Sequence, residues 1–170
     1  QKALAIKPDY AEVNNNLGVM LKDLGQPEEA SKSYKRALAI KPDYAEVYNN
    51  LGVMLKDLGQ LEEAVKNYEK ALVIKPDYAG AYYNLGNTYK NLGQLDAAVK
   101  RYEQVLVIKP DYTKAWNNVF FAAKGLSLYT TQNAWLNSYK KNLNGALLNN
   151  IHFRILEYRL NAFTPHTVDD

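Results

Sequence analysis

The stretch Ile40-Lys41-Pro42-Asp43-Tyr44 recurs along the chain at a constant step of 34 residues, with further copies beginning at Ile6, Ile74 and Ile108. The block from Ala5 to Leu38 differs from the block that follows it at only six positions. A constant period of this length indicates stacked repeats, each of which buries its apolar face against its neighbours. Such an architecture usually provides a surface for holding another molecule rather than a pocket for chemistry.

Each repeat contains two helical patterns, as the unit 45–78 shows. Apolar side chains recur three or four residues apart from Ala45 to Leu58, which predicts a first helix, helix A. A second apolar stripe predicts helix B from Leu61 to Ile74. Gly59 is placed to end helix A in a left-handed conformation, and Pro76 ends helix B because proline has no N–H to donate.

Aspartates that precede helix A are predicted to cap it. Asp77 stands where a side-chain oxygen accepts a hydrogen bond from the first N–H groups of a helix. In the first two units a glutamate follows three residues later, which predicts two capping boxes, Asp9 with Glu12 and Asp43 with Glu46.

A glycine falls inside helix A of each complete unit, where it costs about 1 kcal/mol relative to alanine. Helix B has an alanine at the facing position and a tyrosine four residues later. Because the glycine recurs in every complete unit despite this cost, we expect helices A and B to approach closely there. The tyrosines of helix B are the large side chains predicted to fill this contact. The residues are Gly18, Gly52 and Gly86 on helices A, and Ala30, Ala64, Ala98, Tyr34, Tyr68 and Tyr102 on helices B.

The pattern resembles the tetratricopeptide repeat family, whose signature is aromatic-x2-Leu-Gly-x2-Tyr, then Ala-x3-aromatic, then Pro. The third unit carries it as Tyr82-x2-Leu85-Gly86-x2-Tyr89, Ala98-x3-Tyr102 and Pro110. The resemblance covers residues 1–125 and implies an all-α fold, a right-handed superhelical solenoid of antiparallel helix pairs with capping helices at its C-terminal end. We expect complete repeats at 11–44, 45–78 and 79–112, with partial repeats at 1–10 and 113–125.

The repeat pattern stops within the fourth unit, where Val119-Phe120 replaces Leu-Gly. Residues 126–170 are predicted to form two helices, Thr130 to Leu143 and Ala146 to Phe163, followed by a polar tail. The second of these helices carries two apolar stripes, which indicate contact on two sides. Two interpretations stay open: a terminal cap of the array, and an interface for a dimer or for another domain.

The resemblance implies that helices A line the concave face of the superhelix and bind a peptide there. The residues that it places on this face are Asn15, Asn16, Val19, Asn49, Asn50, Val53, Tyr83, Asn84, Asn87, Asn117, Asn118 and Phe121. One asparagine recurs at the same position of every unit, which is similar to the Asn ladder of the O-linked N-acetylglucosamine transferase repeats. A carboxamide both donates and accepts hydrogen bonds, so such a row suits the backbone of an extended peptide of any sequence. The alternative is that these amides bond neighbouring helices to each other.

A row of lysines, Lys22, Lys56, Lys90 and Lys124, is expected near the edge of the same face. The row would attract an acidic peptide, or it is simply a solvated face, since Asp23 and Asp57 adjoin two of the lysines and surface pairs contribute little. In the family, a clamp for chaperone C-termini needs lysine at the position of Asn15, which argues against such a ligand.

Composition argues against several other classes of function. The 170 residues carry a net charge of +3, and Lys and Arg alternate with Asp and Glu, so no basic face for nucleic acid is predicted. There is no cysteine, and the two histidines, His152 and His166, have no partners at metal-ligand spacing. No apolar run is long enough to span a membrane, and no P-loop or nucleophile elbow is present. We expect no catalysis, cofactor, metal, nucleic acid or membrane partner.

The expected function is therefore that of a non-catalytic, cytoplasmic scaffold that binds a protein or peptide. Two alternatives remain. The start of the chain matches the end of a helix B, and residues 155–160 weakly resemble a segment next to sulfotransferase-like domains, which predicts a regulatory or substrate-recruiting fragment of a larger bacterial transferase. The similar ends of near-identical repeats, or the C-terminal helix, predict a homo-oligomer instead.

Overall fold

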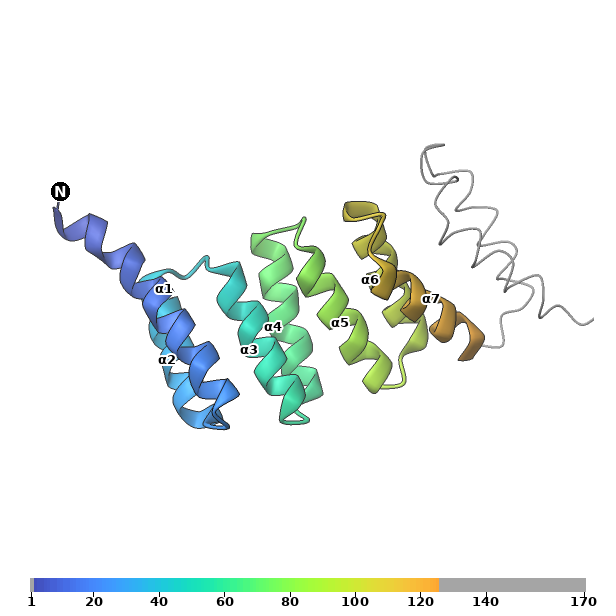
Figure 1. Ribbon diagram of the computed structural model, residues 1–170, viewed down its shortest axis with the longest axis horizontal. Coiled ribbons are helices and arrows are strands. Elements are labelled where there is room, and N and C mark those ends of the chain that lie inside the picture. The colour runs from blue at the N-terminus through green and yellow to red at the C-terminus, as the bar shows by residue number, and fades with distance from the viewer. Residues whose placement is uncertain (1, 126–170) are drawn as a thin grey trace, which may run out of the picture. The chain divides into compact units, whose positions relative to one another are not determined.

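The computed structural model describes residues 2–125, which Figure 1 shows as a series of helices. They are α1 Lys2–Asp23, α2 Pro27–Ile40, α3 Ala45–Asp57, α4 Leu61–Ile74, α5 Ala79–Asn91, α6 Leu95–Ile108 and α7 Thr113–Gly125. No strand occurs in this part of the chain, so the predicted all-α class is confirmed. The helices and tail predicted for residues 126–170 lie outside the described residues.

The chain divides into two units, residues 1–94 with α1 to α5 and residues 95–170 with α6 and α7. In the first unit α1 packs against α2, and α3 packs against α4. These are the pairs predicted as helices A and B of one repeat. Because α3 also contacts α2, and α5 contacts α4, the pairs of this unit stack in sequence order (Figure 1). In the second unit α6 packs against α7.

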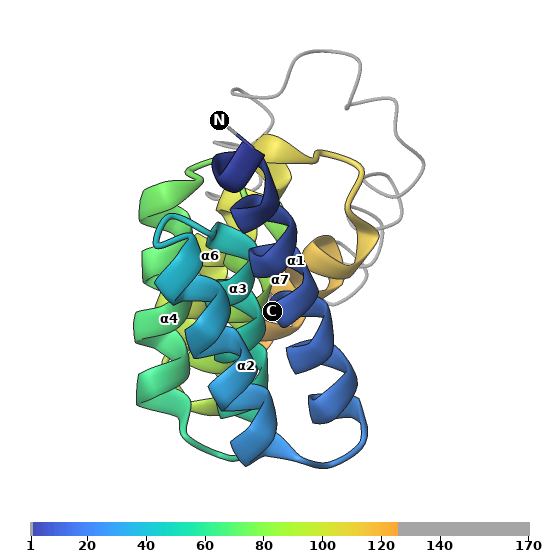
Figure 2. The same cartoon turned by 90° about the vertical axis from the view of Figure 1, so that its left-hand side faces the viewer.

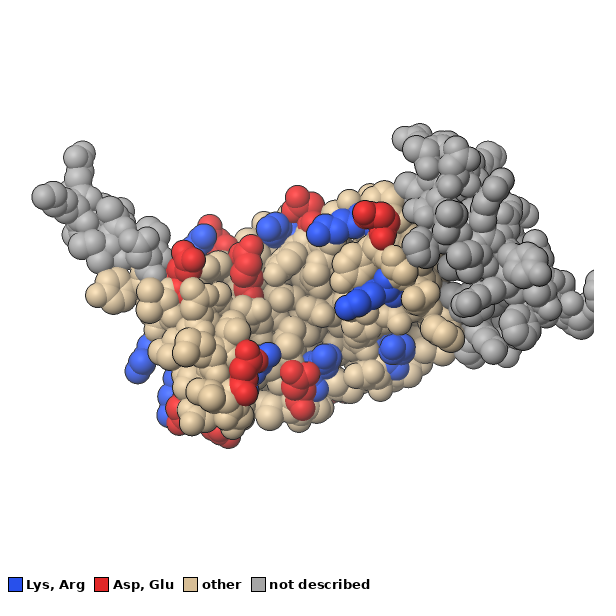
Figure 3. Space-filling model, in the orientation of Figure 1, with Lys and Arg blue, Asp and Glu red and all other residues tan. Residues whose placement is uncertain are grey.

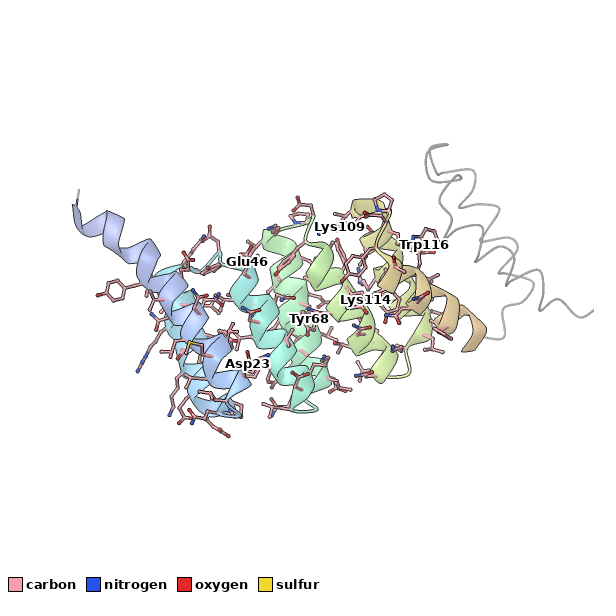
Figure 4. All side chains as sticks on the ribbon, viewed as in Figure 1. Asp23, Glu46, Tyr68, Lys109, Lys114 and Trp116 are labelled. Carbon is pink, nitrogen blue, oxygen red and sulfur yellow. The ribbon has the colours of Figure 1, made fainter. Side chains whose placement is uncertain are left out.

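Helices A and B of one pair meet where a glycine faces a tyrosine ring. Tyr34 and Tyr68 are fully buried, and Figure 4 labels Tyr68 on α4. A Cβ atom added at Gly18 would lie 2.5 Å from Cε1 of Tyr34, and one at Gly52 would lie 2.6 Å from Cε1 of Tyr68. Carbon atoms in contact lie about 3.5 Å apart or more, so only glycine leaves room for the ring. The predicted close approach is confirmed at both pairs.

The same tyrosine rings also join one repeat to the next. Tyr34 belongs to a core cluster that α2 and α3 build together, from Ala30, Ala37, Val47, Leu51 and Met54. Tyr68 forms a second cluster with Ala64 of its own helix and Leu85 of α5. The core of the first unit therefore lies between consecutive helices, and each of these helices B is covered by two helices A.

The turn from helix A to helix B has the same form at Gly25, Gly59 and Gly93, whose φ angles are 73°, 77° and 74°. In this left-handed region glycine avoids the penalty that a Cβ atom would bring. At the second turn the N–H of Gly59 donates to the carbonyl of Lys56 over 3.0 Å, and the N–H of Gln60 donates to that of Leu55 over 2.9 Å. These two bonds form a Schellman motif, which confirms the predicted glycine cap.

The end of helix B is set by its Lys-Pro pair. The N–H of Lys41 closes α2 by donating to the carbonyl of Ala37 over 2.8 Å. Lys41 itself is extended, with φ −132° and ψ 90°, as a residue before proline prefers. Its Nζ lies 4.6 Å from the centroid of the Tyr44 ring, a cation–π contact that ties the turn to the start of the next helix.

The predicted aspartate caps of helix A are wrong. The N-cap residue of α3 is Tyr44, which makes no side-chain capping bond, so Asp43 lies one residue too early. The same holds for Asp77 before α5. Glu46, expected to complete a capping box, instead accepts a hydrogen bond from Nζ of Lys75 at 3.4 Å.

The first copy of the repeated stretch does not break the helix as predicted. α1 runs without interruption from Lys2 to Asp23, so no helix begins at Asp9, as the predicted capping box required. In the second copy Tyr44 packs against the core cluster, whereas Tyr10 is 58% exposed. Because the local sequence is the same, the turn depends on this tertiary packing.

Gly52→Ala should destabilise the protein by about 1–3 kcal/mol, because the new methyl group overlaps the Tyr68 ring. In a Tyr68→Ala background the ring is gone, and the same substitution should stabilise the helix by up to about 1 kcal/mol. Urea unfolding followed by circular dichroism measures both effects. An effect of the same sign in both backgrounds would contradict the packing described here.

Burial changes the acid–base behaviour of the two core tyrosines. It raises the pKa of Tyr34 from 10.0 to about 12, with a further contribution from the charge of Asp23. It also raises the pKa of Tyr68, where Asp57 adds to the effect and the Thr88 hydroxyl opposes it. Both side chains therefore keep their protons in the folded state at a pH where the unfolded chain loses them.

The protein should accordingly lose stability as the pH rises from 10 towards 12. The free energy of unfolding should fall by about 1.4 kcal/mol per pH unit for each of the two tyrosines, since only the unfolded state releases the proton. Urea titrations at a series of pH values measure this slope. The double variant Tyr34→Phe/Tyr68→Phe is the control, and an unchanged slope in that variant would exclude these two groups as its cause.

Candidate functional site

The candidate residues of the first unit lie on α1, α3 and α5. They are Asn15, Asn16 and Val19 on α1, Asn49, Asn50 and Val53 on α3, and Tyr83, Asn84 and Asn87 on α5. Since α3 contacts both α1 and α5, these residues belong to one region, which we call the helix A face. The remaining candidates lie on α7 in the second unit.

Two hydrogen bonds connect the asparagines of successive helices A. Nδ2 of Asn50 donates to Oδ1 of Asn15 over 2.9 Å. Nδ2 of Asn84 donates to Oδ1 of Asn49 over 3.0 Å. At these two positions the asparagines bond neighbouring helices to each other. The sequence left this role open as the alternative to binding a peptide.

In each bonded pair, the asparagine that accepts the hydrogen bond is more deeply buried than the one that donates it. Asn15 and Asn49 are only 9% and 8% exposed, because the next helix A covers them. The sequence predicted both on the open face, whereas the structure places them beneath it. Asn50 and Asn84 are half-buried, and Asn16 is exposed.

Sequence reasoning did not distinguish the buried asparagine from its half-buried neighbour. One signal for the distinction was present. The first two units have adjacent asparagines at 15–16 and at 49–50, whereas the third has Tyr83 before Asn84. The second position of the pair is asparagine at 16, 50, 84 and 118, whereas the first position, asparagine at 15, 49 and 117, is tyrosine at 83.

The bond to the preceding helix fixes the amide plane of Asn50 and of Asn84. Among the described residues, no donor reaches the Oδ1 atom of either side chain. Each amide also keeps a second N–H, since a carboxamide has two. The two side chains therefore present an acceptor and a donor in a fixed orientation on the helix A face.

Apolar and aromatic side chains flank the amides. Val53 on α3 and Tyr83 on α5 are half-buried, and Tyr83 and Asn87 make further contacts within the protein. Figure 3 shows that charged side chains over α3 and α5 gather towards the two margins of this face and leave its middle uncharged. The face thus combines fixed amides with partly apolar surroundings.

Two of the four lysines in the row at the edge pair with the aspartate that follows them in the sequence. Nζ of Lys22 lies 2.9 Å from Oδ1 of Asp23, and Nζ of Lys56 lies 3.3 Å from Oδ1 of Asp57. Asp23 lies at the end of α1 in Figure 4. The third lysine, Lys90, is followed by an asparagine instead of an aspartate. Such surface pairs contribute little to stability, and they reduce the positive charge offered to an acidic ligand.

The candidates Asn117, Asn118 and Phe121 lie on α7, which belongs to the second unit. Asn117 is exposed, Asn118 is half-buried and Phe121 is 65% exposed. Trp116, labelled in Figure 4, is buried, and its Nε1 donates to the carbonyl of Pro110 over 2.8 Å. This bond fixes α7 to the turn that follows α6.

Residues 2–125 contain neither of two other kinds of site. No helix there is both long enough and apolar enough to cross a membrane. No group of three histidine or acidic side chains there is arranged to hold a metal ion.

Models of the tetratricopeptide repeat match consecutive segments of the chain, at residues 20–59, 52–93 and 79–112. The search of curated proteins returned no match. Among solved structures, MamA shares the fold with a TM-score of 0.68 and 25% identity, over 99% of this chain and 84% of that one.

Two further structures are similar in fold. The first repeat domain of Spaghetti (RPAP3), bound to the HSP90 peptide SRMEEVD, has a TM-score of 0.67 and 24% identity, over 70% of this chain and 94% of that one. An O-GlcNAc transferase mutant of Thermobaculum terrenum has a TM-score of 0.63 and 23% identity. That match covers 69% of this chain and 22% of the transferase.

Asn84→Ala should destabilise the protein by about 1–3 kcal/mol, because it leaves the buried Oδ1 of Asn49 without a donor. Asn16→Ala is the matched control. It removes an exposed amide of the same row, and its effect should stay within about 0.5 kcal/mol. Urea unfolding of the two variants compares them, and equal effects would show that the bond between helices contributes nothing to stability.

Proposed function

Because the chain belongs to the tetratricopeptide repeat family, whose members typically bind other proteins, we propose that it is a non-catalytic module that holds an extended segment of a partner protein on the helix A face. The observation that carries this proposal is the fixed orientation of the Asn50 and Asn84 amides. Their side chains are ordered before any ligand arrives, so binding does not bear the entropic cost of ordering them.

The chemistry of the amides favours a peptide backbone as the ligand. A backbone presents an N–H and a carbonyl at each residue, and a carboxamide matches both. Contacts of this kind do not depend on the side chains of the ligand. Val53 and Tyr83 supply the apolar surface beside the amides, where side chains of the ligand gain most from contact.

The ligand is expected to differ from the chaperone tail bound by RPAP3. The family's clamp for such tails needs lysine where this chain has Asn15, and Asn15 is buried beneath α3. Lys22 and Lys56 already pair with aspartates. We therefore propose recognition through the backbone of the ligand rather than through its terminal carboxylates.

Panning a random peptide display library against the full chain tests the proposal. Peptides that bind should lose about tenfold or more in affinity for the Asn50→Ala/Asn84→Ala variant, since each lost hydrogen bond costs about 1 kcal/mol. The face would be excluded as the site if enriched peptides bound this variant as well as the parent.

The variant Asn49→Ala distinguishes a direct contact with the ligand from an indirect effect of lost packing between α3 and α5. This variant breaks the same bond between α3 and α5 but removes an amide that is buried. Under the proposal, Asn49→Ala weakens peptide binding less than Asn84→Ala does at a similar stability. Equal losses would mean that the ladder supports the array and does not contact the ligand.

A further inference from the structure

The third helix A, α5, differs from the first two along the side that the proposed ligand meets. Each helix A carries two residues of the helix A face and one lysine of the row at the edge, spaced by four and then three positions, which places them on one side of the helix. These residues are Asn15, Val19 and Lys22 on α1, Asn49, Val53 and Lys56 on α3, and Tyr83, Asn87 and Lys90 on α5. Figure 2 views the first unit from the end at which α1 lies, and α5 is the helix A farthest from that end. An amide thus stands on α5 where the other two helices carry valine.

The lysine of α5 also differs from the other two in its charge partner. Nζ of Lys22 and Nζ of Lys56 lie 2.9 Å and 3.3 Å from the carboxylate of the aspartate that follows each of them. Lys90 is followed by Asn91, and among the described residues no carboxylate pairs with it. The aspartates neutralise the first two ammonium groups, whereas α5 keeps a full positive charge beside the helix A face.

The two differences on α5 favour the same kind of ligand group. An amide has two N–H groups to donate, and an ammonium group has three, whereas a valine side chain has none. A carboxylate accepts hydrogen bonds with both oxygens, and such bonds are strengthened when the donor carries a charge. Asn87 and Lys90 lie one turn apart, so a single carboxylate can meet both side chains. We call these two residues the α5 subsite.

We propose that the α5 subsite selects an acidic side chain of the ligand, so that a segment bound on the helix A face carries aspartate or glutamate at the residue that lies over α5. The proposal rests on the proposed function, because it assigns a preference to the segment that the face holds. The carboxylate pairs with Nζ of Lys90 and accepts a hydrogen bond from the amide of Asn87. Selection is confined to this one residue of the ligand, since the amides of Asn50 and Asn84 contact its backbone.

The ion pair at the α5 subsite should be weak and sensitive to salt. Lys90 is exposed, and pairs between exposed charges are screened by dissolved ions. Hydrogen bonds between neutral amides and a peptide backbone lack this dependence. Salt therefore separates the contribution of the α5 subsite from that of the asparagine ladder.

The substitution Asn91→Asp tests the proposal, because it gives α5 the aspartate that neutralises the lysine in the first two repeats. Peptides enriched by panning against the full chain should share one acidic position. Asn91→Asp should weaken their binding about two- to fivefold at low salt, and the difference should disappear at about 1 M salt. Val73→Asp is the matched control, since it adds the same charge at a residue of α4 that is 82% exposed, and it should leave binding unchanged.

Peptides in which the shared acidic residue is replaced by its amide complete the test. They should bind the parent protein as weakly as the acidic peptides bind Asn91→Asp, and they should not respond to that substitution. Fluorescence anisotropy measures all four combinations, and the coupling between the two changes isolates the contact.

The α5 subsite and the proposed function fail in different ways. Peptides that depend on the amides of Asn50 and Asn84 but share no acidic position would overturn the subsite and leave the proposed function intact. The same holds for an acidic position to which Asn91→Asp makes no difference. If no enriched peptide depends on those two amides, the proposed function and the subsite are both excluded.

Discussion

The contact between a glycine of helix A and a tyrosine ring of helix B is the constraint on which the described array depends. At Gly18 and Gly52 the ring occupies the space of a missing Cβ atom, which fixes how closely the two helices approach. The same ring then packs against the following helix A, so one side chain belongs to two interfaces. Each tyrosine sets the geometry within a repeat and between repeats. This explains why the glycine and the tyrosine recur at the same positions of successive repeats.

The asparagine bonds add polar connections on another side of the same helices. A buried amide without a partner would cost more than the bond contributes, so Asn15 and Asn49 make the array sensitive to the residue at the neighbouring position. This dual use explains why a structural role and a binding role are both compatible with the ladder. The bond that holds one helix A to the next also holds the amide in the position that a ligand would meet.

Features that depend on one repeat alone could be predicted from the sequence. Local periodicity predicts the helix from Leu61 to Ile74, the start of the preceding helix at Ala45 and the glycine turns. Residue size predicts the contact of Gly52 with Tyr68. Features that depend on a neighbouring repeat could not be predicted in this way. The copy of the repeated stretch at Tyr10 has the sequence of a turn but lies in a helix, and Tyr10 is exposed where Tyr44 packs against a core cluster. Likewise, the burial of Asn49 depends on α5, and a single repeat contains no information about it.

The bonds between helices A also give the array a sense of direction. Asn50 donates to Asn15 and Asn84 donates to Asn49, so both N–H groups point towards the N-terminal end of the chain. The row is therefore polar along its length, with donors and acceptors in a set order. A peptide backbone is polar in the same sense, and reversing it exchanges the places of its N–H and carbonyl groups. Under the proposed function, the two orientations of a bound segment would be unequal in energy, and the array would distinguish the beginning of its ligand from its end without contacting a single side chain.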